Sequence, residues 1–190
     1  HAVPSAVKFT FTLSANSDVF LIDDVAVILT GGSAFNARPI EFEGGYYATM
    51  GRSIIKWDEN NDAWLPVYLD ASYQITALES YEGNLIAGRG DSANYKVSGD
   101  GASWSDPTTN SGNARFASKL ARVLNARGDW ALMKTRANQV SLTQNPADTN
   151  NWGAEIQVGD PDRDTTSLVS AAGTAYVGRE DGLYVYDRRI

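Results

Sequence analysis

The sequence of 190 residues has no cysteine, and its single histidine is the first residue. The lack of cysteine excludes a disulfide framework, a thiolate metal site and a cysteine nucleophile. The lack of an internal histidine excludes histidine metal clusters and Ser-His-Asp catalysis. Most enzyme classes are lost with these residues, and paired carboxylates remain as the only realistic catalytic machinery.

Long apolar runs and an excess of positive charge are also missing. The longest apolar run, residues 19–29, is interrupted by Asp23 and Asp24 and is shorter than the roughly 20 residues of a membrane helix. The 16 Lys and Arg against 23 Asp and Glu leave a net charge of −7, which opposes binding to nucleic acid or to an anionic membrane surface. We therefore expect neither a nucleic-acid partner nor membrane insertion.

Helical periodicity is weak throughout the chain. No segment longer than about ten residues keeps apolar residues at i, i+3, i+4 and i+7, and the best candidate, residues 114–124, falls where a strand is expected. Hydrophobic residues are 43% and charged residues 21% of the chain, which is ordinary for one globular domain with a real core. The sequence therefore predicts an all-β domain.

A repeat of strands and turns begins at residue 38. Its loop glycines are separated by 38, 45 and 45 residues, and they are Gly45, Gly83, Gly128 and Gly173. Each glycine lies between two short β-like runs, and a third such run follows. A polar turn then ends in tryptophan in three of the units, at Trp64, Trp104 and Trp152. Four short antiparallel strands in about 40–45 residues are typical of a β-propeller blade.

The predicted fold is a β-propeller of four-stranded antiparallel blades, with four or five blades or as a fragment of a larger propeller. The blades are expected at residues 38–74, 75–119, 120–164 and, without a fourth strand, 165–190. Residues 1–37 form an N-terminal unit with strands at residues 8–13, 19–22 and 25–29. Residues 8–30 either supply the missing strand and close the ring, which removes exposed edges, or reach a neighbouring subunit. The other alternative is a longer propeller of which this chain is a piece.

One hairpin, residues 96–107, is the best preserved copy of the tryptophan turn. Asp100 can accept hydrogen bonds from backbone N–H groups, Gly101 allows a positive φ, and Trp104 can cover the apolar side. The segment from Ser98 to Trp104 resembles the Asp-box, or bacterial neuraminidase repeat, of sialidase-like β-propellers. It has one residue fewer between Asp100 and Trp104 than the usual pattern. The copies at Trp64 and Trp152 indicate that the turn fastens a blade.

A second resemblance covers the last part of the chain. The order of five segments resembles that in propeller repeats of uncharacterised phage virion and tail-associated proteins. These segments are Trp152 and residues 156–161, 166–169, 175–178 and 180–186. This resemblance implies a structural or host-recognition part of a virus particle. Five Trp and nine Tyr could form sugar-stacking platforms, but at recurring blade positions tryptophan more often serves packing.

A basic residue follows the second strand of each unit. These residues are Arg52, Arg89, Lys134 and Arg179. In a four-stranded blade they are expected at the end opposite the loop glycines, where guanidinium groups could bind the carboxylate of a sialic or uronic acid. The alternative, which we favour, is that a repeated turn position keeps a solvated residue.

Carboxylates offer two further hypotheses. Asp160, Asp162 and Asp164 alternate in a way that could present oxygen atoms to Ca²⁺, although an acidic turn needs no metal. A glycoside hydrolase needs two acids at a defined separation, and the candidates lie at the turns after the second strands: Asp91, Glu180 and Asp181. A sialidase would need a tyrosine nucleophile. Tyr184 and Tyr186 alternate as packed strand residues do, so we make no sialidase assignment.

The expected function is a non-catalytic structural or recognition module of a virion or another extracellular assembly. Its expected partners are other protein subunits, further copies of this chain and surface glycans, with no cofactor apart from the Ca²⁺ considered above. The alternative is a glycan-binding or glycoside-hydrolysing propeller. Propellers host many functions, so the fold alone does not decide between them.

Overall fold

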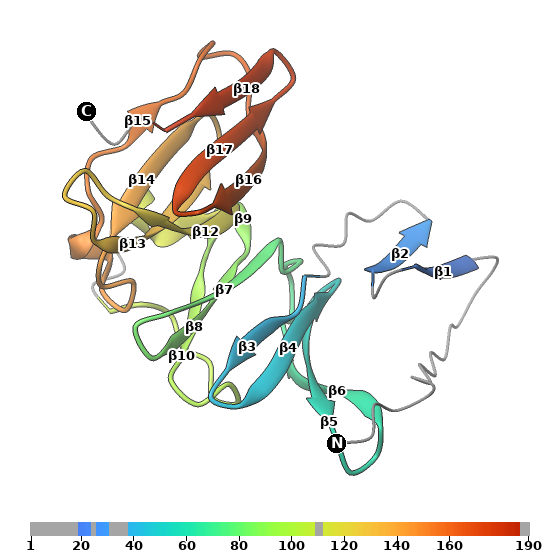
Figure 1. Cartoon of the computed structure of the whole chain (residues 1–190). Coiled ribbons are helices and arrows are strands. Elements are labelled where there is room, and N and C mark those ends of the chain that lie inside the picture. The colour runs from blue at the N-terminus through green and yellow to red at the C-terminus, as the bar shows by residue number, and fades with distance from the viewer. Residues whose placement is uncertain (1–18, 24–25, 31–37, 109–111, 187–190) are drawn as a thin grey trace.

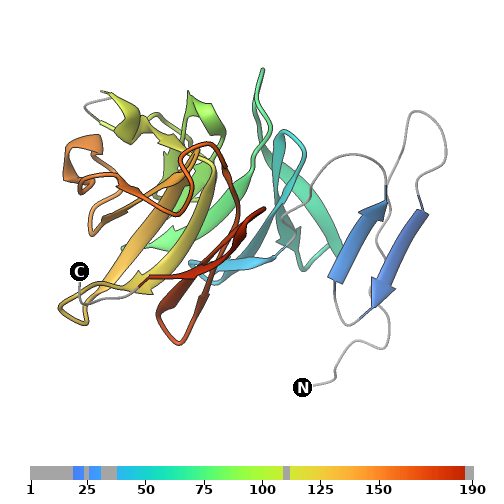
Figure 2. The same cartoon turned by 90° about the horizontal axis from the view of Figure 1, so that it is seen from above.

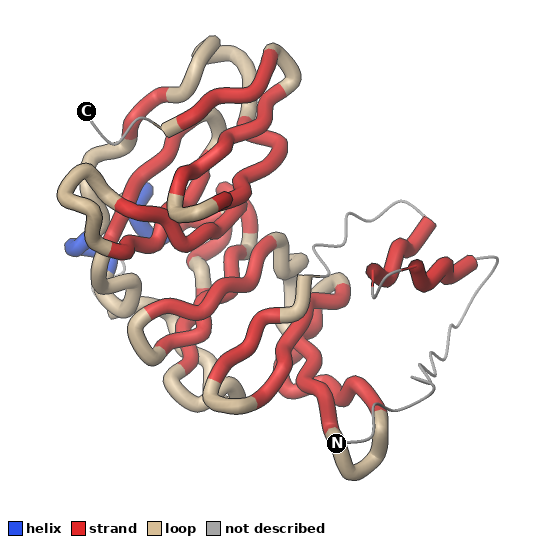
Figure 3. The backbone as a smooth tube through the Cα atoms, viewed as in Figure 1, coloured by secondary structure: helices blue, strands red, loops and turns tan. Residues whose placement is uncertain are grey.

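The computed structural model is all-β and describes residues 19–23, 26–30, 38–108 and 112–186, with the backbone alone described for the first two ranges. Its strands fold into successive antiparallel sheets, coloured red in Figure 3. Among the described residues, the helical segments are two short 3₁₀ turns at Asn113–Arg115 and Thr149–Asn151. No helix in these ranges has the length and apolar character needed to cross a membrane.

Two strands precede the blades. β1 (Val19–Asp23) and β2 (Ala26–Thr30) pair antiparallel with each other, at the two apolar runs that flank Asp23 and Asp24. Among the described strands, neither pairs with a strand of a blade, and in Figures 1 and 2 the hairpin lies on the side of the first blade, away from the last. The strand predicted at residues 8–13 lies outside the described residues. Ring closure and contact with a neighbour both stay predictions.

The first blade is a four-stranded meander. Its strands pair in chain order and are β3 (Ile40–Phe42), β4 (Gly45–Met50), β5 (Ser53–Asp58) and β6 (Ala63–Leu69). The β3–β4 turn has positive φ at both central residues, Glu43 and Gly44, which matches the twist of a two-residue hairpin. Glu82–Gly83 and Ala172–Gly173 repeat this geometry. The glycine equivalent to Gly83 is therefore Gly44, and the alignment on Gly45 is wrong by one residue.

The second blade departs from the predicted pattern. It contains β7 (Ala77–Tyr81), β8 (Asn84–Gly88) and β10 (Lys96–Ser98). The expected third strand at residues 93–97 is divided, because β9 (Gly90–Asn94) leaves the sheet and pairs with β11 (Phe116–Ala117). The fourth strand is reduced to a single bridge between Val97 and Ser105.

The third and fourth blades complete the described chain. The third has four strands, β12 (Lys119–Leu124), β13 (Trp130–Arg136), β14 (Gln139–Thr143) and β15 (Ile156–Gln157). The fourth has three, β16 (Thr165–Ala171), β17 (Thr174–Arg179) and β18 (Gly182–Val185). The four blades follow one another along an open arc in Figures 1 and 2.

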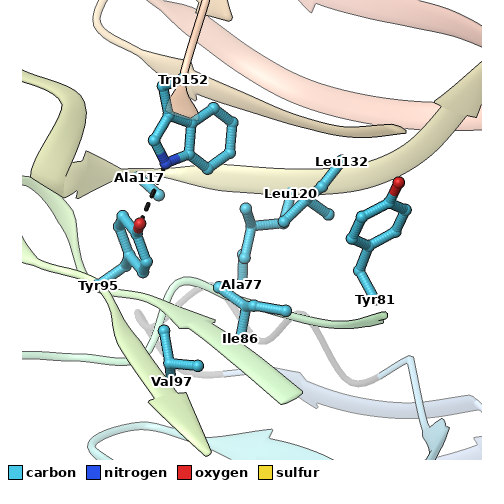
Figure 4. Packing of buried hydrophobic residues seen from close by; sticks show 9 residues of the cluster. All are labelled: Ala77, Tyr81, Ile86, Tyr95, Val97, Ala117, Leu120, Leu132 and Trp152. Carbon is cyan, nitrogen blue, oxygen red and sulfur yellow. Dashed lines mark hydrogen bonds between the residues drawn. The ribbon is translucent and has the colours of Figure 1, made fainter. Parts of the chain in front are cut away.

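The core lies between blades, in three clusters that each draw on two successive blades. Figure 4 shows the cluster between the second and third blades, where Trp152 Nε1 donates to Tyr95 Oη at 3.0 Å. In the preceding cluster Trp104 packs against Tyr68 of the first blade, with the ring planes tilted by 37° and the ring centroids 5.5 Å apart. Because the central strands are covered on both faces, β8 and β13 form continuous buried runs instead of alternating ones. The β-propeller fold class is thereby confirmed.

Candidate functional site

The four repeated basic residues lie at the expected end of the blades, and their N–H groups contact backbone carbonyl groups. Arg52 is exposed in the β4–β5 turn, and its Nη1 donates to Ala71 O at 2.7 Å. Arg89 follows β8, where its Nη1 donates to Asn94 O at 2.9 Å and its Nε lies 2.8 Å from Asp70 Oδ2. Asp70 is in the segment that links the first and second blades.

Lys134 and Arg179 are buried in the second strands of their blades. Lys134 is 1% exposed, and its Nζ donates to the carbonyl oxygens of the segment before its blade, those of Asn113, Ala114 and Phe116. Arg179 Nη2 donates to the carbonyl oxygens of Asp160 and Arg163, again in the segment before its blade. Three of the four basic residues therefore hold the segment that enters their own blade. The expectation of a solvated turn residue fits the exposed Arg52 and is wrong for Lys134 and Arg179, which are buried because their charged groups hold backbone carbonyl groups. Ligand binding at this end stays a prediction.

Three acidic side chains of the same end have polar partners, whereas Asp162 and Asp164 are exposed. Asp160 Oδ1 accepts from the backbone N–H of Asp162 at 2.9 Å, and within the described ranges no three acidic side chains gather as metal ligands would. Glu180 pairs with Arg163 at 2.5 Å, and Asp181 Oδ2 accepts from Tyr184 Oη at 3.0 Å. The calcium hypothesis gains no support from this geometry and remains a prediction.

The tryptophan hairpin has the contacts of a fastening turn. Asp100 Oδ1 accepts from the N–H groups of Ala102 and Ser103 at 2.8 and 2.7 Å and from Ser98 Oγ at 3.0 Å. These hydrogen bonds, first those from the backbone, hold the pKa of the Asp100 carboxyl well below its usual range. Gly101 has φ +71°, and a Cβ there would overlap the hydroxyl of Tyr47 in the first blade.

The hollow inside the arc was not found from the sequence. The first strands of the blades adjoin in order, β3 with β7, β7 with β12 and β12 with β16. Together they line a hollow of about 450 Å³, which we call the first-strand pocket. Its polar lining consists of Arg38, Glu41, Glu79, Ser80, Arg122 and Ser170, and its exposed aromatic side chain is Trp130. Its volume lies within the range of about 300–1,000 Å³ that is usual for small-ligand pockets, and its lining is more polar than is usual for them.

Glu79 is the distinctive residue of the first-strand pocket. It is 6% exposed, and among the described residues it forms no salt bridge and one hydrogen bond, from the N–H of Ser80 at 3.2 Å. Burial raises the pKa of its carboxyl above the ordinary value, and the charges of Arg38 and Arg122 partly offset this. A buried carboxylate with so little compensation costs stability.

A second hollow adjoins the first across Trp130. It has a volume of about 560 Å³, is lined by Tyr81, Glu82, Asp129 and Gln144, and shares the Trp130 side chain with the first-strand pocket. We call it the turn hollow, because Glu82 and Asp129 belong to the turns between first and second strands. Both hollows thus include the end of the blades that carries the loop glycines, whereas the basic residues that the sequence suggests for binding lie at the other end.

The antiparallel blades and their inter-blade cores define a β-propeller protein, and comparisons with solved structures agree. The chain is similar to virginiamycin B lyase from Staphylococcus aureus, with a TM-score of 0.53, 9% identity and coverage of 89% of this chain and 62% of that one. A streptogramin B lyase matches with a TM-score of 0.52 and 9% identity over 90% of this chain and 61% of the other. YCF48 bound to D1 peptide matches with a TM-score of 0.50 and 10% identity over 85% and 54%.

At these identities the likeness concerns the fold alone. The chain spans about three fifths of the length of the two lyases. No family model matches the sequence, and no curated protein matches it. The likeness to Asp-box proteins and to phage proteins therefore rests on the motifs described above.

Proposed function

We propose that this chain is a non-catalytic recognition module of a virion or another extracellular assembly, and that it binds its partner at the first-strand pocket. The observation that carries the proposal is Glu79, a buried carboxylate held in a pocket without a salt-bridge partner among the described residues. A group that costs stability in a cleft is more often kept for binding or chemistry than for folding.

Two further points support recognition over catalysis. Of the three acids predicted as hydrolase candidates, Glu180 pairs with Arg163 and Asp181 accepts from Tyr184, whereas Asp91 is exposed in strand β9 and not in a turn. The solved propeller YCF48 is described as bound to a D1 peptide, which is a precedent by analogy for a propeller that binds a protein segment. The lyases among the similar structures are the corresponding precedent for an enzyme.

A fragment screen by NMR tests the proposal. Short peptides and oligosaccharides are added to the ¹⁵N-labelled protein, and backbone shifts are mapped for the wild type, for Glu79→Gln and for the control Glu59→Gln, which lies in an exposed turn away from the pocket. We expect at least one fragment to shift pocket residues in the wild type and in Glu59→Gln, with a weaker effect in Glu79→Gln and no chemical conversion. Fragments that bind nowhere near the pocket would refute the site, and a fragment cleaved during the titration would refute the non-catalytic assignment.

A further inference from the structure

We propose that the first-strand pocket and the turn hollow together bind a short uncharged oligosaccharide that lies across Trp130. This inference rests on the proposed function, because it names the ligand class of the same site. It also differs from the sequence-based hypothesis of an acidic sugar at the basic residues, both in location and in the charge of the ligand.

Trp130 is placed as a platform between two polar hollows. Its side chain is 46% exposed although it lines both. The residue is fixed through its backbone, since Trp130 O accepts from Tyr81 Oη at 2.6 Å. The Arg122 guanidinium lies 5.4 Å from the ring centroid, which orients that cation over the ring. An apolar ring held between polar groups suits a ligand that is apolar on one face and polar at its edges.

The polar groups of the first-strand pocket are of opposite kinds. Arg38 and Arg122 can only donate hydrogen bonds, whereas an ionised Glu79 can only accept them. A hydroxyl group does both, so a sugar ring with several hydroxyl groups can satisfy guanidinium and carboxylate at once. A ligand group that is purely anionic or purely cationic would meet repulsion from one of the two kinds.

The charge around the two hollows disfavours acidic glycans. Two arginines, Arg38 and Arg122, stand against four acidic residues, so the formal charge of the combined lining is −2 at neutral pH. The four acidic residues are Glu41, Glu79, Glu82 and Asp129. The whole chain adds to this effect with its net charge of −7. Uronic and sialic acids are therefore repelled on approach.

A peptide fits the lining less well than a sugar. Peptide recognition depends on apolar or aromatic anchors buried in pockets, or on a free strand edge. Of the aliphatic residues at the first-strand pocket, Pro39 and Ala172 are small and exposed, whereas Ile40 is 5% exposed and is already packed against the second blade. Trp130 is the one large apolar side chain that is half exposed in the described lining.

The test uses the indole N–H signals of the five tryptophans, with that of Trp130 assigned from Trp130→Phe. The probes are maltotriose, cellotriose and N,N′,N″-triacetylchitotriose as neutral sugars, with trigalacturonate, 3′-sialyllactose and triglycine for comparison. We expect at least one neutral trisaccharide to shift the Trp130 signal saturably. Its Kd is measured by isothermal titration calorimetry, because the Trp130 variants lack the indole signal. The Kd should rise about tenfold or more in Trp130→Ala, which loses the stacking platform, and also in Glu79→Gln. The control Trp64→Ala, in a strand that lines neither hollow, should bind as the wild type does.

The outcomes separate the two proposals. If triglycine or an acidic sugar shifts the Trp130 signal while all neutral sugars fail, the ligand class is wrong and the recognition site stands. If no probe shifts Trp130 in the wild type, the site is wrong as well. Equal affinity of a neutral sugar for the wild type and Trp130→Phe supports a role for the ring, and equal affinity for Trp130→Ala would overturn it.

Discussion

Replacing Lys134 by methionine should remove a pH dependence of stability that one buried amine imposes. The Lys134 side chain is almost fully enclosed, donates to three backbone carbonyl groups and lies 4.7 Å from the centre of the Trp152 ring. Burial lowers the pKa of the amine to about 8 from its ordinary 10.5, although the negative charge of Glu155 acts to raise it.

The direction in which stability changes with pH follows from proton binding. Between pH 8 and pH 10.5 the unfolded chain keeps the proton that the folded chain has released, so this residue makes stability rise with pH in that interval. At about 1.4 kcal/mol per pKa unit, the whole shift corresponds to about 3 kcal/mol. Below pH 8 the folded chain holds the charged amine and bears this cost in full.

The measurement is urea unfolding followed by tryptophan fluorescence at several pH values from 7 to 10. The unfolding free energy of the wild type minus that of Lys134→Met should grow by about 2–3 kcal/mol over this range. Other groups titrate in both proteins and cancel in the difference. The control Lys119→Met removes a partly exposed lysine from the neighbouring strand β12. A difference for Lys134→Met that changes with pH no more than that of the control would refute the buried charged amine.

Three further outcomes are expected. Gly101→Ala should lower the unfolding free energy by about 2 kcal/mol or more, because the position has positive φ and no room for a Cβ. The control Gly99→Ala, whose Cβ would have no atom within 4 Å, should be nearly neutral in the same urea assay. Tyr95→Phe should lower the unfolding free energy by about 1–3 kcal/mol, because the Tyr95 hydroxyl both donates to Pro146 O and accepts from the indole N–H of Trp152. This loss should exceed that of Tyr81→Phe, which removes one hydrogen bond. Glu79→Gln should be at least as stable as the wild type at pH 7. Because the pKa of Glu79 is raised in the folded chain, the wild type loses stability as the pH rises from 4.5, so the advantage of the variant should fade as the pH falls toward that value. A loss of stability in the variant at pH 7 would show that Glu79 is structural.

The fold could be predicted because its signals are local. Each turn between a first and a second strand carries a glycine with positive φ, and each tryptophan hairpin carries its own hydrogen-bond chemistry, so both recur visibly in the sequence. The register of the first unit was wrong because Gly44 and Gly45 are adjacent and only the backbone φ distinguishes the turn glycine. The division of the third strand in the second blade depends on pairing with β11, more than twenty residues further on, which no local pattern encodes.

The candidate pocket could not be predicted in the same way. Glu79, Arg122 and Ser170 come from three different blades and meet only when the blades pack. One signal was present in the sequence, since Glu79 interrupts a strand whose other residues are apolar or small. The repeated basic residues suggested a ligand site, but Lys134 and Arg179 donate hydrogen bonds to carbonyl groups of irregular segments. The need for these donors becomes visible only in three dimensions.

Because each core cluster of the described residues lies between two successive blades, the four blades form a linear series of coupled units. The second and third blades share clusters with neighbours on both sides, whereas within the described residues the fourth blade shares one cluster, with the third. In such a chain the free energy of opening depends on the number of intact neighbours. Amide exchange should therefore be slowest in β8 and β13 and faster in β18, so that the fourth blade opens before the second and third.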